Sequence, residues 1–188
     1  LQLRTVVLDL NGNTLTISAT PQEGSSVGIS ATYGCTIQNG TILANCDFTA
    51  LFTNIGGDQL TVENVTVKVS ENNEITYGLF FPAGGAVGQM TFSNCVMAER
   101  IETLCFMTGS DSDSSYKGLK IESGHYTGLT GEPPAYITTP GTLVEDIPGV
   151  NAGKVYKSED TTALIVRDGN AYLYDTLQDA VDDAARRG

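Results

Sequence analysis

The chain has 188 residues, of which 40% are hydrophobic and 17% charged, and it contains 21 glycines and no tryptophan. A chain of this length buries roughly 70% of its unfolded surface in one main core. The many glycines and few charges favour a turn-rich β protein over a disordered chain. The formal net charge of −12, with only ten Lys and Arg, argues against a surface that binds nucleic acid.

A short pattern recurs along the first two thirds of the chain. Each copy is an apolar, a polar and an apolar residue followed by a break, as in LDLNGNTL (8–15), CTIQNGTI (35–42), LTVENVTV (60–67), MTFSNCVM (90–97) and LKIESGHY (119–126). The break residues are separated by 28, 25, 30 and 29 residues, and they are Asn11, Asn39, Asn64, Asn94 and Ser123. A period of this size predicts a solenoid, in which each unit buries its apolar face against its neighbours.

The repeating unit is predicted to be made of β-strands. Alternation of apolar and polar residues puts neighbouring side chains on opposite faces of a strand. A second apolar strand that ends in glycine lies in each of the four intervals between copies, at 29–34, 50–57, 78–85 and 104–109. We therefore predict an all-β fold, a right-handed parallel β-helix of about five coils over residues 1–128.

Stacked coils require matched positions in every coil. Asparagine adopts left-handed backbone conformations at low cost, and stacked amides can bond along the axis, so the five break residues are predicted to form a corner ladder. The expected inward files are Cys35, Leu60, Met90, Leu119 and Ile37, Val62, Phe92, Ile121. The expected outward files are Thr36, Thr61, Thr91, Lys120 and Gln38, Glu63, Ser93, Glu122. In the first coil a shift of one residue is expected, with Leu8 and Leu10 inward.

The segments LDLNG and TIQNGT, one coil apart, resemble the pectate-lyase-like superfamily of single-stranded right-handed β-helices. The likeness is strongest to repeat domains of large bacterial surface proteins and covers about residues 5–128. It implies an extracellular setting at the cell surface or cell wall, within a longer multidomain chain. We expect no membrane span in this chain, because no apolar run approaches the roughly 20 residues that one needs.

The last third of the chain departs from the repeat. Residues 129–154 are predicted to form an irregular connection rich in glycine and proline. Residues 155–188 are predicted to form a hairpin that turns at Asp168-Gly169 and a short capping helix. Asp175 is the expected N-cap of that helix, and Leu177, Ala180, Val181 and Ala184 are its expected apolar stripe. The helix is expected either to cap a coil end or to open a following repeat domain.

Few residues suggest catalytic or metal chemistry. The four cysteines lack the spacing of a zinc site and are interpreted as buried thiols, with a Cys35–Cys46 disulfide as the alternative. The single histidine, His125, is interpreted as a residue of the surface or of the solenoid rim. A calcium-loop template fits Asp111, Asp113, Ser115 and Glu122 in part, but the turn glycine is missing. We predict no cofactor and no catalytic residue.

The outward polar files are the predicted binding face. Thr36, Thr61, Thr91, Gln38, Glu63 and Ser93 would present a regular polar surface, which suits extended polysaccharide or host surface glycans. The preferred function is a non-catalytic structural or adhesin-like module of a bacterial surface protein. The alternatives are a polysaccharide lyase or glycoside hydrolase, for which Glu63 and Glu122 are the best carboxylate pair, and a phage tail-fibre module.

Overall fold

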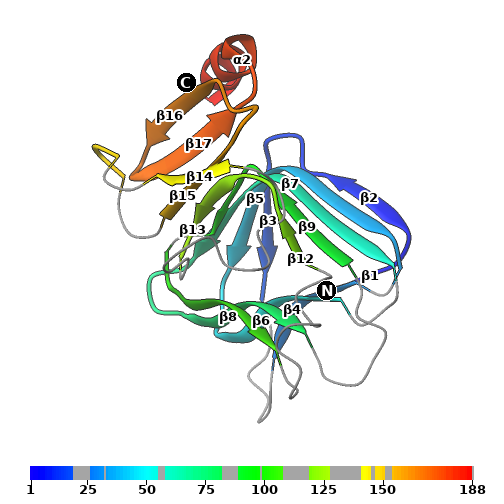
Figure 1. Cartoon of the computed structure of the whole chain (residues 1–188). Coiled ribbons are helices and arrows are strands. Elements are labelled where there is room, and N and C mark those ends of the chain that lie inside the picture. The colour runs from blue at the N-terminus through cyan, green and yellow to red at the C-terminus, as the bar shows by residue number, and fades with distance from the viewer. Residues whose placement is uncertain are drawn as a thin grey trace.

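Two facing β-sheets form most of the molecule, and a smaller C-terminal unit stands on one end of them (Figure 1). The computed structural model describes residues 1–18, 26–31, 33–54, 58–81, 89–97, 99–107, 119–127, 141–144, 147–150 and 154–187. Sheet A contains β1 (Gln2–Leu3), β4 (Val27–Ala31), β6 (Phe48–Asn54), β8 (Ile75–Phe81) and β11 (Ile101–Met107), in that spatial order.

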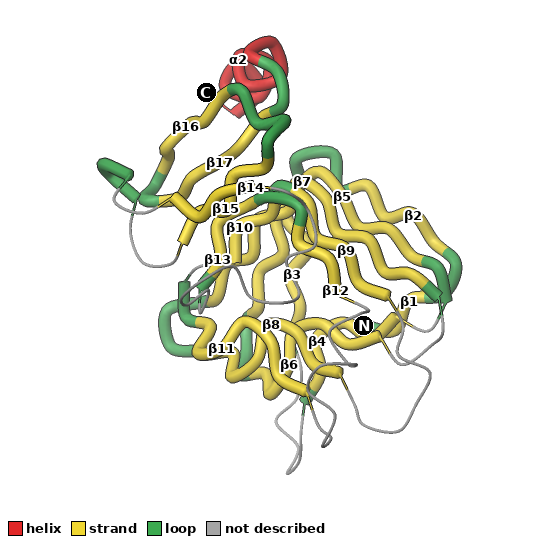
Figure 2. The backbone as a smooth tube through the Cα atoms, viewed as in Figure 1, coloured by secondary structure: helices red, strands yellow, loops and turns green. Residues whose placement is uncertain are grey.

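Sheet B is built from the strands that carry the repeated pattern. Its solenoid strands are β2 (Val6–Asp9), β3 (Thr14–Ile17), β5 (Cys35–Ala44), β7 (Gln59–Val69), β9 (Gln89–Ser93), β10 (Cys95–Met97), β12 (Leu119–Ile121) and β13 (Gly124–Tyr126). The chain alternates between the two sheets, and neighbouring solenoid strands within each sheet run parallel. The fold is therefore a parallel β-solenoid, as the sequence predicts (Figure 2).

The solenoid has about three turns, fewer than the five coils predicted. Three coils have substantial strands in both sheets: β4 with β5, β6 with β7, and β8 with β9 and β10. The first coil begins with the two-residue β1, and the last coil has only three-residue strands in sheet B. Counting repeats overestimates the turns because a coil at either end keeps the pattern but forms short strands.

The register of sheet B agrees with the predicted files. Cys35 pairs with Leu60, Leu60 with Met90, and Met90 with Leu119. The second inward file is fully buried, at 0 to 1% exposure, and consists of Ile37, Val62, Phe92 and Ile121. Across the interior, the Phe52 ring of sheet A meets Phe92 edge to face, with the ring centroids 5.6 Å apart. Contacts of this kind between the two sheets hold the solenoid together.

The first coil carries a two-residue insertion at its corner. Asp9 pairs with Gln38 and Thr14 with Thr41, so four residues, 10–13, lie opposite residues 39 and 40. The predicted shift is confirmed, because Leu10 is buried, Leu8 packs against the core and Asp9 is exposed. Gly40 lies beneath this loop, where an added Cβ atom would stand 2.4 Å from the Leu10 Cβ atom. Any larger residue there would displace the loop.

The C-terminal unit begins within the segment predicted to be irregular. β14 (Gly141–Val144) and β15 (Lys154–Ser158) pair antiparallel, and β15 also pairs antiparallel with β13. Residues 128–140 lie outside the described part of the chain. β15 therefore covers the edge of β13, which would otherwise leave backbone hydrogen-bonding groups unpaired at the end of the solenoid.

The hairpin is confirmed and the helix start is corrected. β16 (Ala163–Arg167) and β17 (Asn170–Tyr174) flank Asp168 and Gly169, whose φ angles of 51° and 75° suit a two-residue hairpin turn. α2 (Leu177–Arg187) is capped by Thr176, not by Asp175. The Thr176 hydroxyl accepts a bond from the Asp179 N–H at 3.1 Å and donates to its carboxylate at 2.6 Å. This reciprocal pair satisfies one of the backbone N–H groups that the first turn of a helix leaves without an intrahelical partner.

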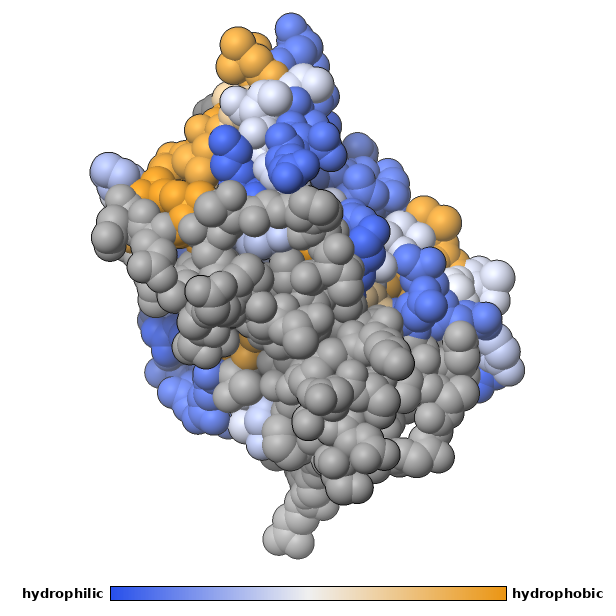
Figure 3. All heavy atoms as spheres, viewed as in Figure 1, coloured by the Kyte–Doolittle hydropathy of each residue, from blue (hydrophilic) through white to orange (hydrophobic). Residues whose placement is uncertain are grey.

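The predicted apolar stripe of α2 is wrong. Ala180 is buried, but Leu177 and Val181 are 70% and 54% exposed, and Ala184 is exposed as well. Figure 3 shows apolar side chains at the surface of this C-terminal unit. The helix instead presents Ala180 and Asp183 to the hairpin, because polar contacts of Asp183 set its orientation.

α2, at 11 residues, is too short to cross a bilayer, and no other helix in the described ranges meets the length and hydropathy that a span requires.

Candidate functional site

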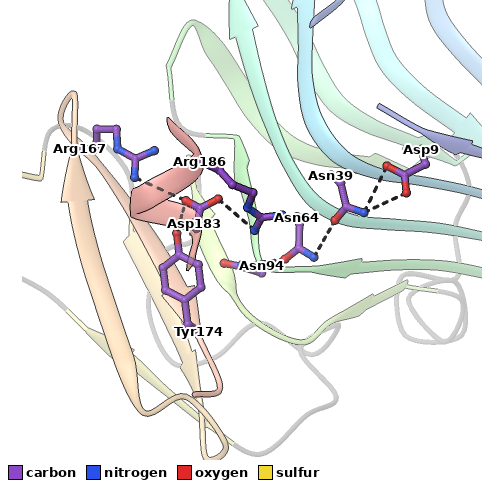
Figure 4. Close-up of polar contacts among 8 residues, drawn as sticks. All are labelled: Asp9, Asn39, Asn64, Asn94, Arg167, Tyr174, Asp183 and Arg186. Atoms are coloured by element: carbon purple, nitrogen blue, oxygen red, sulfur yellow. Dashed lines mark hydrogen bonds and ion pairs between the residues drawn. The ribbon is translucent and has the colours of Figure 1, made fainter. Parts of the chain in front are cut away.

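A chain of side-chain amides runs along the corner of the solenoid (Figure 4). The Asn94 amide donates to Asn64 Oδ1 at 2.9 Å, and the Asn64 amide donates to Asn39 Oδ1 at 3.3 Å. All three residues have positive φ angles, between 47° and 59°. Asparagine therefore serves both as the residue that bends each coil and as a rung of the ladder.

Both ends of the amide ladder are closed by other groups. At the first coil, the Asn39 amide donates to the Asp9 carboxylate at 3.3 Å, and the Gln38 amide donates to it at 2.8 Å. These bonds favour the charged carboxylate, and the Gln38 bond is the main reason that the pKa of Asp9 lies below its ordinary value of 3.8. At the other end, the Leu173 N–H donates to Asn94 Oδ1 at 3.0 Å. The ladder thus joins the first coil to β17.

Two of the five predicted ladder residues have other roles. Asn11 bends the first coil, with a φ angle of 47°, but its backbone N–H bonds to Asp9, and Asp9 receives the Asn39 amide in its place. Ser123 accepts a bond from the Asn94 backbone N–H at 3.0 Å. The positive φ angle of the last coil belongs to Gly124, at 139°. The insertion at residues 10–13 moves Asn11 out of the file.

The ladder forms one wall of a groove of about 870 Å³. The solenoid wall consists of Asn11, Gly12, Asn13, Asn39, Glu63, Asn64, Thr66, Ser93, Asn94 and Ser123. The opposite wall consists of Tyr172, Leu173, Tyr174, Asp175, Asp179, Asp183 and Arg186 of the C-terminal unit. Polar side chains dominate both walls, so the groove suits a ligand with many hydroxyl or amide groups.

The opposite wall is held in place by Asp183. Its carboxylate is almost fully buried and accepts a bond from the Tyr174 hydroxyl at 2.7 Å. The Arg167 and Arg186 guanidinium groups lie 3.5 Å and 3.8 Å from the same carboxylate. Arg167 also lies over the Tyr172 ring, 5.4 Å from its centroid. These contacts hold α2 against the hairpin and fix the orientation of both tyrosine side chains.

The ladder leaves hydrogen-bonding capacity for a ligand. A primary amide has two N–H donors and two acceptor lone pairs. The ladder contacts of Asn64 use one donor and one lone pair. Successive rungs of a sheet lie about 4.8 Å apart. The groove wall can therefore offer a donor and an acceptor at a regular interval along the solenoid axis.

The predicted polar face is only partly in this groove. Glu63 and Ser93 line it. Gln38 bonds to Asp9, and the threonine file of Thr36, Thr61 and Thr91 pairs in register and is half-buried, but no threonine of that file lines the groove. The binding role of this face stays a prediction.

The interpretation of His125 as a surface or rim residue is wrong. His125 is completely buried in β13, where it pairs in register with Val96 of β10 and Val155 of β15. Its Nδ1 atom lies 3.5 Å from the Ala171 N–H of β17. His125 therefore belongs to the junction between the solenoid and the C-terminal unit.

The predicted buried thiols agree with the structure for two cysteines. Cys35 and Cys95 are buried, Cys46 is half-buried, and no disulfide joins Cys35 to Cys46. Burial raises the pKa of the Cys95 thiol to about 12, which suppresses the reactive thiolate. The side chain of Cys105 is outside the described residues.

Most residues of the calcium-loop hypothesis fall outside the described part of the chain. Asp111, Asp113 and Ser115 lie outside the described residues, and Glu122 forms an ion pair with Lys120 at 2.5 Å. Within the described ranges, no three His, Cys, Asp or Glu side chains gather as a metal site would require.

Sequence reasoning missed the wall made by the C-terminal unit. Asp179, Asp183 and Arg186 are spaced by four and three residues, so they share one helical face. That polar stripe was a usable signal, but the apolar residues Leu177 and Val181 gave a competing stripe. Nothing local indicated that this face would lie opposite the corner asparagines.

Comparison with protein-family models, with curated proteins and with solved structures gave no match. The evidence for function is therefore the geometry of the groove itself.

Proposed function

We propose that this protein is a non-catalytic, adhesin-like module that binds carbohydrate in the groove between the amide ladder and the C-terminal unit. The observation that supports this function is a groove of about 870 Å³ with amides on one wall and tyrosines and carboxylates on the other. The bacterial cell-surface setting rests on the resemblance of the coil pattern to repeat domains of such proteins.

The chemistry of the groove matches that of a saccharide. Sugar hydroxyl groups both donate and accept hydrogen bonds, as do the amides of Asn64 and Asn94. The tyrosines combine an apolar ring with a hydroxyl group, and Asp183 orients Tyr174 before any ligand arrives. An oriented site loses less entropy on binding than a mobile one.

Blocking the groove tests the proposal. Ser93 lies on β9, lines the groove and is half-buried. Ser93→Trp would place a large ring in the groove, at a strand position that tolerates aromatic residues. We expect the natural chain to bind neutral oligosaccharides on a glycan array and the Ser93→Trp variant to lose this binding.

Thr91→Trp is the matched control. Thr91 is two residues earlier on the same strand, and it does not line the groove. This variant is expected to bind like the natural chain. Loss of binding in Thr91→Trp alone would move the site to the threonine file, and absence of binding by the natural chain would contradict the proposed function. Release of reducing ends from a bound glycan would indicate an enzyme instead.

A further inference from the structure

The carboxylates of the groove bear on the class of glycan that it takes. Glu63 projects from β7 of the solenoid, and Asp175 and Asp179 stand at the start of α2 on the opposite wall. All three are exposed. Within the described residues, none of them has a cationic side chain within 4.0 Å. A ligand in the groove would therefore meet carboxylates without a cationic side-chain partner on both sides.

The cations beside the groove offset this charge only in part. Arg186 lines the groove and pairs with Asp183 at 3.8 Å, and Arg167 lies 3.5 Å from the same carboxylate, so these three groups together carry a net charge of +1. Glu63, Asp175 and Asp179 carry −3, so the groove remains negative. The chain as a whole carries a formal charge of −12. A polar cleft with carboxylates on both walls repels uronate or sulfated glycans and attracts positive charge.

The groove carboxylates suit a ligand with several separate positive charges better than a single metal ion. The described carboxylates do not gather into a cluster suited to one metal ion. Amides and tyrosine hydroxyls lie along the same groove and bond to uncharged groups. A ligand that satisfies both features is a sugar chain with separate ammonium groups.

We infer that the groove selects an oligosaccharide of hexosamine units that carry free ammonium groups, over its N-acetylated and its uronate counterparts. This inference rests on the proposed function, because it specifies the ligand of the same groove. The ammonium groups pair with Glu63, Asp175 and Asp179, and the hydroxyl groups bond to the amide ladder.

Calorimetric titration of the whole chain with three tetrasaccharides tests the inference. The probes are a de-N-acetylated hexosamine tetramer, its fully N-acetylated form and a uronate tetramer. We expect the de-N-acetylated form to bind most tightly and the uronate form most weakly. Each exposed ion pair should contribute about two- to fivefold in affinity, and the advantage over the N-acetylated form should shrink in high salt.

Matched variants separate a specific site from general charge attraction. Glu63→Gln removes one groove carboxylate and is compatible with the fold, because Gln38 occupies the preceding position of the same file. It should lower affinity for the de-N-acetylated tetramer about two- to fivefold and lower affinity for the N-acetylated tetramer by a smaller factor. Glu71→Gln, an exposed residue outside the groove, should change neither.

The outcomes that overturn each claim differ. If neither hexosamine tetramer binds, the inference is wrong, whereas the proposed function is wrong only if the natural chain also binds no neutral oligosaccharide on the glycan array. If both bind equally well, the groove binds sugar but the ammonium preference is wrong. An equal loss in Glu63→Gln and Glu71→Gln would also overturn the inference, because the attraction would then come from net charge alone.

Discussion

Asparagine at the corner of a coil meets two separate requirements. Asn64 has a φ angle of 54°, which costs most L-residues about 1–2 kcal/mol. Its side chain also joins the rungs on both sides. Few residue types combine a left-handed backbone with a side chain that donates and accepts. The recurrence of asparagine at successive corners follows from this combination.

Substitution of Asn64 separates the two requirements. Asn64→Ala loses both ladder bonds and strains the backbone, and we expect it to lower the free energy of unfolding by about 2–4 kcal/mol. Asn64→Gly loses the same bonds but relieves the strain, so it should cost about 1–2 kcal/mol less than Asn64→Ala. Urea denaturation measures both. Equal losses in the two variants would mean that alanine adopts the left-handed conformation at this corner without a cost in free energy.

Asp9 makes the end of the ladder sensitive to acid. Its pKa in the folded chain is lower than the ordinary 3.8, chiefly because Gln38 donates to it. A depressed pKa stabilises the fold above pH 3.8, and that contribution is lost as the pH falls through the folded-state pKa. We therefore expect Asp9→Asn to lose less stability than the natural chain on acidification below about pH 4.

Urea denaturation from pH 6 down to about pH 2.5 measures this effect. Asp160→Asn is the control, because Asp160 is exposed in a turn far from the ladder in sequence. The pH profile of this control should follow that of the natural chain. If Asp9→Asn retains the full acid sensitivity, the carboxylate does not terminate the ladder as described.

Residue identity alone predicted the corners but not every environment. The left-handed conformation of Asn39, Asn64 and Asn94 follows from what asparagine tolerates. The burial of His125 could not be predicted, because it depends on β15 and β17 packing onto β13. The N-cap of α2 is Thr176 and not the predicted Asp175. Both residue types are good N-caps, but it is the Thr176 hydroxyl that reaches Asp179.

At the scale of elements, alternation along the strands was the most informative signal. The files from Cys35 to Leu119 and from Ile37 to Ile121 have the register predicted from sequence. A shift of one residue would expose a whole buried file, so this register is strongly specified. In α2 the same reasoning failed. Its apolar residues suggested one buried face, but Asp183 is buried with Ala180 and turns Leu177 and Val181 outward.

Removing the Asp183 carboxylate should loosen α2 without harming the solenoid. Asp183→Ala leaves the Tyr174 hydroxyl and two guanidinium groups without their shared acceptor, which costs about 1–3 kcal/mol locally. Hydrogen exchange should accelerate across 177–187 and stay unchanged in β5 and β7.

Asp182→Ala is the neighbouring control for this helix. Asp182 is exposed, and its side chain accepts a bond from Gln178 within the same helix. Exchange in α2 should therefore change much less than in Asp183→Ala. Similar acceleration in both variants would indicate that helix propensity, and not the buried carboxylate, holds α2 on the hairpin.

At the scale of the whole molecule, the groove arises from contacts between distant segments. Asn94 and Leu173 are 79 residues apart, yet their hydrogen bond places the C-terminal unit beside the ladder. The solenoid wall was visible in the sequence because it repeats. The opposite wall occurs once, and its position depends on β15 pairing with β13. The sequence therefore predicted the solenoid wall of the candidate site but not the opposite wall.

The central claim is that the amide ladder and β17 together hold a saccharide. Nuclear magnetic resonance of the ¹⁵N-labelled chain, titrated with an N-acetylated hexosamine tetramer, tests it most directly. We predict that the side-chain amides of Asn64 and Asn94 and the backbone amide of Leu173 shift together, with one dissociation constant. Shifts confined to Thr36, Thr61 and Thr91, or no shift in the ladder amides at saturation, would contradict the account.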